Sequence, residues 1–456
     1  MHVLRHGPVL SAIATVAIPM ALVMIVNAVF SFLDLWFIAR LGPDALHAMD
    51  VLFPYISFSN ALVYAGLGTG VSVVVARQAG RGASWEKVLQ AGLLLALPLS
   101  LICILGAAWG QDVLLHALGT DTSRAMASMY SFWYFMFFPI MAFGAVISSA
   151  MRGTGHALRP ALLSVGCIVL KAVLTPVLSY DDYGFGWGIQ GAAVSTVLAY
   201  TVLFLLLMRD LHRERHILKL VRLKMKPDRR VCQRILHSGI VAAQVPVLAS
   251  VVLLLVLDTM MARSVSMADA FSLAKRFELY LIQLTVCLGC GTMVVMRANM
   301  EAGDGSRVWA TMRTALKLLF ALGLPLVIAM SQFSDVFYRS LTSDTTIMHE
   351  GHKYFTYGGL HMLFTLAIIL LNFGFQGIGR PFHALPYLVI SIVLVQGGGS
   401  WMLRSELLDS VVYYSFISVG SALTFFMALR VLRRMVLGQH ADREMAPAWS
   451  VAEASG

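Results

Sequence analysis

The sequence predicts an all-α polytopic membrane protein, with twelve transmembrane helices in two six-helix lobes. Its 456 residues are 58% hydrophobic and only 13% charged, which is too apolar a composition for a soluble surface. Apolar runs of about 20 residues, the length that crosses a hydrocarbon core of roughly 30 Å, recur along the chain. Glycine motifs of the first half also recur in the second half at a nearly constant spacing, which indicates an internal repeat.

Each apolar run gives one expected helix, with six before and six after a central basic stretch. The first six are expected at residues 11–39, 45–76, 88–110, 125–150, 159–180 and 186–208. The second six are expected at residues 235–257, 270–296, 311–331, 354–378, 383–402 and 409–430. The predicted domains are an N-lobe at 1–208, a basic cytoplasmic linker at 209–234, a C-lobe at 235–437 and a disordered tail at 438–456.

The placement of basic residues predicts the orientation of these helices. Short cytoplasmic loops are enriched in lysine and arginine. In this chain the even-numbered loops and the stretch Arg209–Arg234 carry most of them, whereas the odd-numbered loops are leaner and more acidic. We therefore expect a multi-pass protein of the inner (plasma) membrane with both termini in the cytoplasm. The net charge of +10 then lies largely on one membrane face, which argues against a nucleic-acid partner.

The repeat is read from motifs that share one register. The stretch Gly66–Thr69 recurs as Gly289–Thr292, displaced by 289 minus 66, or 223 positions, and Arg152–Gly155 matches Gln376–Gly379 at an offset of 224. Because six helices are an even number of crossings, the two lobes have the same membrane orientation and are related by an axis along the membrane normal. The interface between the lobes is then the expected cavity.

The most informative single residue is Asp34, which lies inside the apolar stretch 29–37 of the first expected helix. Insertion scales assign a cost of roughly 2.5 to 3.5 kcal/mol to an aspartate at the centre of a membrane helix. Such a residue requires a partner, a proton or a function. We interpret Asp34 as a site that couples transport to an ion.

Several stretches match motifs of one known family. They are Ile18-Pro19 with Asp34–Gly42, Gly66–Gly80, Arg152–Gly155, Gly188–Thr196 and Gln376–Arg380. With these motifs the chain resembles the multidrug and toxic compound extrusion (MATE) family, and its DinF-type branch more than its NorM-type branch. The resemblance implies a twelve-helix, two-lobed antiporter that exports amphipathic, often cationic compounds in exchange for protons or sodium.

The resemblance also implies a cation site where Asp34 meets residues of the fifth and sixth helices. The family usually has an asparagine and, four residues later, an aspartate in its fifth helix, whereas this chain has Lys171 and Thr175 there. These positions lie one turn apart on one helix face, and Thr196 matches the family residue of the sixth helix. Sodium binds several hard oxygen ligands and no fixed cation beside them, so the lysine favours proton over sodium coupling. The Asp34–Lys171 pair is either a switch or a static ion pair, and the sequence leaves both open.

Five side chains are candidates for the substrate cavity. Tyr134 and Phe138 belong to an aromatic-dense fourth helix, which forms either a stacking wall for flat cations or an interfacial belt. Glu278 lies in a charged group near the start of the eighth helix, where long side chains either reach the outer interface or line the cavity mouth. His361 is either a titrating group or hydrogen-bonded packing, and Gln283 is a weaker candidate for the lining.

The sequence offers no glycine-rich nucleotide loop and no cluster of metal ligands, so we expect neither an enzyme nor a cofactor or metal site. The predicted function is a secondary active antiporter whose partners are amphipathic or cationic small molecules, protons in preference to sodium, and membrane lipid. The alternatives are a flippase for lipid-linked saccharides of the same superfamily, an integral-membrane lipid enzyme, and a receptor or scaffold that transports nothing.

Overall fold

The computed structural model describes residues 8–79, 85–118, 121–156, 158–182, 184–213, 228–405, 407 and 409–444. Every regular element in these ranges is a helix, so the predicted all-α membrane fold is confirmed. Most of the expected linker, residues 214–227, lies outside these ranges, as does the end of the expected tail, residues 445–456. The last helix, Ser410–Glu444, continues into the expected tail, and disorder of that tail stays a prediction.

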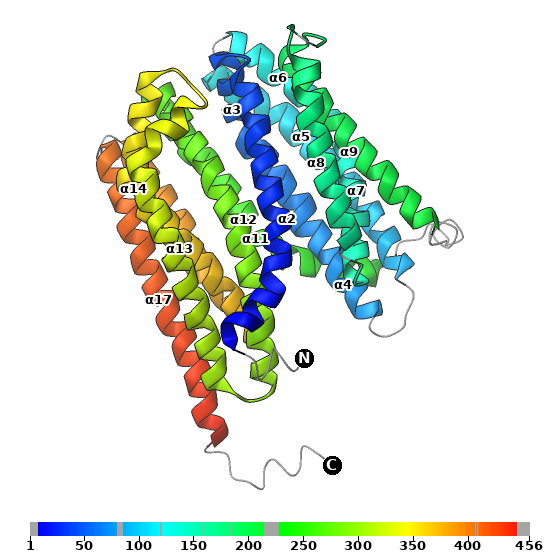
Figure 1. Ribbon diagram of the computed structural model, residues 1–456, viewed down its shortest axis with the longest axis vertical. Helices are drawn as coiled ribbons and strands as arrows, with labels where there is room; N and C mark the ends of the chain where they lie inside the picture. The colour runs from blue at the N-terminus through cyan, green and yellow to red at the C-terminus, as the bar shows by residue number, and fades with distance from the viewer. Residues whose placement is uncertain are drawn as a thin grey trace. The chain divides into compact units, whose positions relative to one another are not determined.

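The helices fall into two compact units (Figure 1). The N-terminal unit comprises Val26–Val265 and Ser340–Thr342, and the C-terminal unit comprises Met1–Ile25, Ser266–Arg339 and Ser343–Gly456. The N-terminal unit takes the second part of α2 (Val9–Ala39) and then α3 (Pro43–Asn60), η1 (Ala61–Gly68), α4 (Thr69–Ala79), α5 (Glu86–Leu118), α6 (Asp121–Met136), α7 (Phe138–Gly153), α8 (Leu158–Ser179), α9 (Gly188–Arg213) and α11 (Arg229–Arg263). The division into lobes at 208 and 235 stays a prediction.

The C-terminal unit takes the first part of α2 and the remaining helices. These are α12 (Val265–Glu301), α13 (Gly305–Arg339), α14 (Thr345–Gly377), η2 (Pro381–Ala384), α15 (Leu385–Val389), η3 (Ile390–Gly397), α16 (Gly398–Arg404) and α17 (Ser410–Glu444). Within this unit α14 packs along both α13 and α17 (Figure 1).

Most of these helices are long and apolar enough to cross a membrane. Among the described residues ten helical segments meet this requirement, or up to eleven if a bent pair is taken as one span. The bent pair is α6 and α7, which meet at an angle of 48° within the single span expected at 125–150. The Met24–Ala39 part of α2 is a shorter apolar helix. Each of the twelve predicted spans thus coincides with helical structure, and the protein is a multi-pass membrane protein.

The second expected helix, at 45–76, is interrupted by a π-helical stretch. The structure divides it into α3, the π-helix η1 and α4. Small residues let this segment approach α11: a Cβ atom added to Gly70 would lie only 3.1 Å from the backbone nitrogen of Gly239, and one added to Gly66 would lie 3.3 Å from the Cβ of Ala243. The small-xxx-small spacing of Gly66 and Gly70 therefore serves close helix packing.

The repeat seen in the sequence has a structural counterpart inside each unit. A Cβ atom on Gly153 of α7 would approach the carbonyl oxygen of Ser72 in α4 to 2.6 Å. A Cβ atom on Gly377 of α14, its repeat equivalent at an offset of 224, would approach the Cβ of Met296 in α12 to 3.0 Å. Since 296 minus 72 is also 224, the same helix contact is present in both halves.

Candidate functional site

The fifth expected span is α8, which contains a proline at the level of the candidate site. Pro176 lies inside α8, and a proline has no N–H to donate to the preceding turn. The hydroxyl of Thr175 bonds back to the carbonyl oxygen of Lys171 at 2.9 Å, a contact that often accompanies helix bending. Lys171 and Thr175 are one turn apart, so both side chains leave α8 on the same face.

The next helix, α9, approaches α8 closely because it begins with small residues. A Cβ atom added to Gly191 would lie 2.5 Å from the carbonyl oxygen of Leu178, which real Cβ atoms do not do. Only glycine therefore fits at this crossing. Ser195 follows one turn later, on the same face of α9, and its hydroxyl lies 2.9 Å from the hydroxyl of Thr175.

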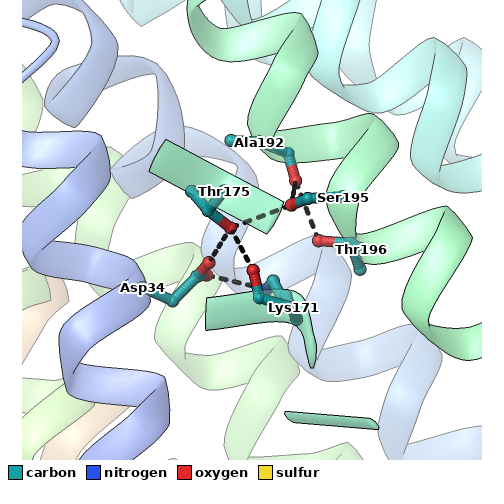
Figure 2. A network of polar contacts seen from close by, with 6 residues as sticks. All are labelled: Asp34, Lys171, Thr175, Ala192, Ser195 and Thr196. Carbon is teal, nitrogen blue, oxygen red and sulfur yellow. Dashed lines mark hydrogen bonds and ion pairs between the residues drawn. The ribbon is translucent and has the colours of Figure 1, made fainter. Parts of the chain in front are cut away.

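These helices and α2 bring together Asp34, Lys171, Thr175 and Ser195, which we call the Asp34 cluster: Lys171 and Thr175 contact the carboxylate, and Ser195 contacts Thr175 (Figure 2). Lys171 Nζ donates to Asp34 Oδ2 at 2.7 Å, and Thr175 Oγ1 donates to Asp34 Oδ1 at 3.1 Å. The side chains of Lys171 and Asp34 are only 19% and 14% exposed. Both carboxylate oxygens thus have donors in an environment with little water.

Thr175 has more acceptors than it has hydrogens. Its single hydroxyl hydrogen can go to Asp34 Oδ1 or to the Lys171 carbonyl oxygen, while the Ser195 hydroxyl can donate to Thr175. A hydrogen bond to an ionised carboxylate is about twice as strong as one to a neutral group, so Asp34 is the preferred acceptor while it is charged.

A second set of contacts joins α2 to Tyr180, the residue that follows α8. The hydroxyl of Tyr180 donates to the carbonyl oxygen of Phe37 at 2.8 Å. The guanidinium of Arg40 lies 5.0 Å from the ring centroid of Trp36 and 5.8 Å from that of Tyr180, which is within the range of cation–π attraction. Asp34 is therefore not the sole anchor of α2 on α8.

The family residue on α9, Thr196, faces elsewhere. Its hydroxyl donates to the carbonyl oxygen of Ala192 in its own helix at 3.0 Å, whereas the adjacent Ser195 reaches Thr175 (Figure 2). Sequence reasoning missed Ser195. The signal that identifies it is its position four residues after Gly191, because residues at that spacing share the helix face that crosses α8.

The aromatic candidates Tyr134 and Phe138 are both buried in the N-terminal unit. Tyr134 donates from its hydroxyl to Asn60 Oδ1 at 3.2 Å, and its ring centroid lies 6.0 Å from that of Phe138. Contact of either ring with a substrate stays a prediction.

The candidates of the C-terminal unit come together in a second charged group, which we call the Glu278 cluster. Lys275 Nζ donates to Glu278 Oε2 at 2.7 Å and lies 3.4 Å from His361 Nε2. Tyr354 donates from its hydroxyl to Glu278 Oε2 at 3.3 Å, and His361 Nδ1 lies 2.7 Å from Ser421 Oγ. The cluster joins α12, α14 and α17, and His361 and Glu278 are buried.

Whether these side chains extend to the outer interface or line the cavity mouth stays a prediction. The helix α12 begins at Val265, five residues before the expected start, so Lys275 and Glu278 lie further from its first residue than expected. Their side chains are 11% and 3% exposed. Gln283 lies further along α12 and is half-buried. A cavity role for Glu278, His361 and Gln283 stays a prediction.

The comparisons with known proteins agree with this fold. The family model described as MatE matches residues 19–177 and 246–398. The FAD transporter of Shewanella oneidensis is 23% identical over 357 residues, which cover 75% of this chain and 78% of that protein. The probable multidrug resistance protein YoeA of Bacillus subtilis is 24% identical over 347 residues, which cover 74% of each.

Solved structures of transporters share the fold of this chain. An inward-facing multidrug resistance MATE transporter of the MOP superfamily superposes with a TM-score of 0.82 at 21% identity, covering 93% of this chain and 99% of that chain. A MOP superfamily transporter from Pyrococcus furiosus, described as having a binding pocket of reverse polarity, gives a TM-score of 0.77 at 22% identity, covering 96% and 98%. Because the family model spans most of both halves of the chain, the protein belongs to the MatE family of membrane transporters.

Proposed function

We propose that this transporter is a secondary active antiporter that exports amphipathic, often cationic small molecules in exchange for protons. The observation that carries the proposal is the ion pair between Lys171 Nζ and Asp34 Oδ2, at 2.7 Å between largely buried side chains of the N-terminal unit. An ionisable pair inside an apolar span is expensive, and such pairs in transporters often mark the path of a proton or substrate.

The geometry of the Asp34 cluster supports protons over sodium. A sodium ion requires several oxygen ligands, but Lys171 and Thr175 already donate to the two oxygens of Asp34. The ammonium group would also repel a sodium ion placed beside the carboxylate. A proton needs only one carboxylate oxygen and no coordination shell.

Protonation of Asp34 would change the cluster in two ways. The Lys171 ammonium would lose its anionic partner while remaining buried, which is an unfavourable state. The Thr175 hydrogen would no longer have a charged acceptor and could turn to the Lys171 carbonyl oxygen, 2.9 Å away. A ligand or proton drives a conformational change only by its differential affinity for two states, and this rearrangement supplies such a difference.

The alternative of a static ion pair is weakened by the second set of contacts, between α2 and Tyr180. The Tyr180 hydroxyl already joins α8 to the Phe37 carbonyl of α2. A pair that served only to hold α2 on α8 would duplicate this contact, at the cost of burying two charges. We therefore assign the pair the role of a switch.

The test is efflux measured in proteoliposomes under an imposed pH gradient or an imposed sodium gradient. We expect the wild-type protein to respond to the pH gradient, and Asp34→Asn or Lys171→Asn to lower proton-driven transport at least about fivefold, the low end of typical coupling energies. Removing one partner of a buried pair also destabilises a protein by roughly 3 to 5 kcal/mol. The double variant Asp34→Asn with Lys171→Asn, which leaves no unpaired charge, keeps the result interpretable.

Tyr180→Phe is the matched control, because it removes the hydrogen bond from Tyr180 to the Phe37 carbonyl without removing a charge. Transport close to wild type in Tyr180→Phe, together with loss in the double variant, supports the switch. An unchanged rate and pH profile in the double variant would show that the pair is inert scaffolding. A response to the sodium gradient alone would show that sodium, and not the proton, is the coupling ion.

The substrate panel follows from the relatives and the alternatives. It includes lipophilic cationic dyes, FAD because one relative is named as its transporter, and a lipid-linked saccharide for the flippase alternative. We also propose the inner membrane as the location, with both termini in the cytoplasm, because the basic loops alternate with acidic ones along the chain.

A further inference from the structure

We propose that Glu278 is a second proton-binding carboxylate, so that each unit of this transporter contains its own buried lysine–carboxylate switch. The proposal rests on the proposed proton antiport and extends it from one site to two. Its basis is that Lys275 and Glu278 form a pair with the same Nζ–O distance, 2.7 Å, as Lys171 and Asp34.

The Glu278 pair is even less exposed than the Asp34 pair. Its side chains are 11% and 3% exposed, against 19% and 14% for Lys171 and Asp34. A surface lysine–glutamate pair contributes little to stability, whereas burying two charges in an apolar span is costly unless they are paired and hydrogen-bonded. The cost indicates a function beyond simple packing of α12.

After Glu278 is protonated, the Lys275 ammonium still has a hydrogen-bond acceptor within the cluster. When a proton from water binds Glu278, the Lys275 ammonium loses the carboxylate but still has His361 Nε2 as an acceptor, at 3.4 Å. Ser421 lies 2.7 Å from the other ring nitrogen, Nδ1, and fixes the orientation of the imidazole. The step adds one proton to Glu278 and breaks only the Lys275–Glu278 hydrogen bond, leaving a net positive charge that favours a different packing.

Buried tyrosines give the proton a polar environment between Glu278 and α17. The titratable and charged groups around the cluster are Lys275 and Arg276 on α12, His361, Tyr354 and, next to Tyr414, Glu350 on α14, Tyr338 on α13, and Tyr413 and Tyr414 on α17. The ring of Tyr354 lies 5.3 Å from that of Tyr414. The buried hydroxyls of Tyr413 and Tyr414 have no hydrogen-bond partner among the described residues, so each is able to bond to a water molecule.

This second site is not the repeat copy of the first. The repeat equivalent of Asp34 is residue 34 plus 223, which is Leu257, and that of Glu278 is residue 278 minus 223, which is Tyr55. The two pairs therefore lie at different places in their halves. Neutralising one of them removes one exchangeable proton and leaves the other pair with its own partners.

The test is the number of protons moved per substrate, measured in proteoliposomes as the pH gradient that just balances an imposed gradient of a cationic dye. We expect about two protons per cycle in the wild type and about one in Glu278→Gln, because each buried carboxylate exchanges one proton. The control is Glu350→Gln, which breaks the Lys353–Glu350 pair on α14. That pair has the same three-residue spacing and 2.7 Å distance but is more exposed, at 27% and 16%.

The outcomes separate this inference from the proposed function. An unchanged ratio in Glu278→Gln, or a ratio of about one in the wild type, overturns the second site but not proton antiport. The absence of any proton dependence in the wild type overturns both. If Glu278→Gln does not fold, Tyr354→Phe removes one hydrogen bond to Glu278, and His361→Gln removes the imidazole that contacts both Lys275 and Ser421. A shifted pH profile in either variant supports the site, and wild-type profiles in both refute it.

Discussion

At the scale of single residues, the sequence predicted the acid and its base but not the residue that completes the site. An isolated carboxylate in an apolar helix requires a partner, the family resemblance implied that Lys171 lies beside Asp34, and the structure pairs them at 2.7 Å. The third helix of the site was assigned to Thr196 by resemblance, yet Ser195 makes the contact with Thr175. The resemblance named the family position, whereas the spacing of four residues from Gly191 points to Ser195 only once the structure shows that Gly191 lies at the crossing with α8.

The contribution of Ser195 to transport can be tested by comparison with the adjacent Thr196. Ser195→Ala removes the hydroxyl that lies 2.9 Å from Thr175, and we expect proton-driven transport to fall about fivefold, the effect of roughly 1 kcal/mol for one hydrogen bond. Thr196→Ala removes a hydroxyl that bonds only within its own helix among the described contacts, at 3.0 Å. We expect transport rates within about twofold of wild type for that variant, since such a bond is easily replaced. The opposite ranking, measured as initial rates in proteoliposomes, would place Thr196 in the site and Ser195 outside it.

At the scale of helices, the site depends on how closely α8 and α9 approach. Sequence analysis found the motif that contains Gly191, but the reason for the glycine becomes visible only in the structure, where no space remains for a Cβ atom beside Leu178. The bend at α6 and α7 and the π-helical η1 were also not expected. Both are local departures from a regular helix. Hydropathy is averaged over a window of residues, so it does not resolve departures of this size.

The crossing of α8 and α9 gives a prediction about stability. Gly191→Ala forces a methyl group against the Leu178 carbonyl, and overpacking of this kind costs about 1 to 3 kcal/mol. We expect a lower melting temperature in detergent and weaker transport, because the helices must separate and Ser195 moves away from Thr175.

The control for this crossing is Gly166→Ala, in the interior of α8. A Cβ atom there meets nothing within 4 Å, and replacing a helical glycine by alanine favours the helix by up to about 1 kcal/mol. We expect a melting temperature equal to or above that of the wild type. A melting temperature for Gly191→Ala that equals that of Gly166→Ala would show that the close crossing is not required.

At the scale of the whole molecule, composition and hydropathy were sufficient for the fold class, and the repeat was sufficient to relate the halves. The twelve expected spans correspond to helical segments because membrane helices must satisfy their own backbone hydrogen bonds. The sequence did not show that Lys275, Glu278 and His361 share one cluster, since their meeting depends on the packing of α12 against α14 and α17. The DinF-type branch stays a prediction.

The expected orientation can be measured with single cysteines in a variant without the native ones. Asp182, between α8 and α9, and Ala302, between α12 and α13, are both exposed and lie in loops of opposite expected side. We expect a membrane-impermeant thiol reagent to label Asp182→Cys in intact cells and Ala302→Cys only after the membrane is opened. Labelling of Ala302→Cys in intact cells would reverse the orientation.

The glycine contacts present in both halves also bear on how the molecule originated. Gly153 and Gly377 support the same helix crossing in the two copies, whereas neither buried carboxylate has a carboxylate at the corresponding place in the other copy. The shared crossing fits a duplicated ancestral half that already contained it. The two halves then share a scaffold by descent but differ in where each carries its buried carboxylate.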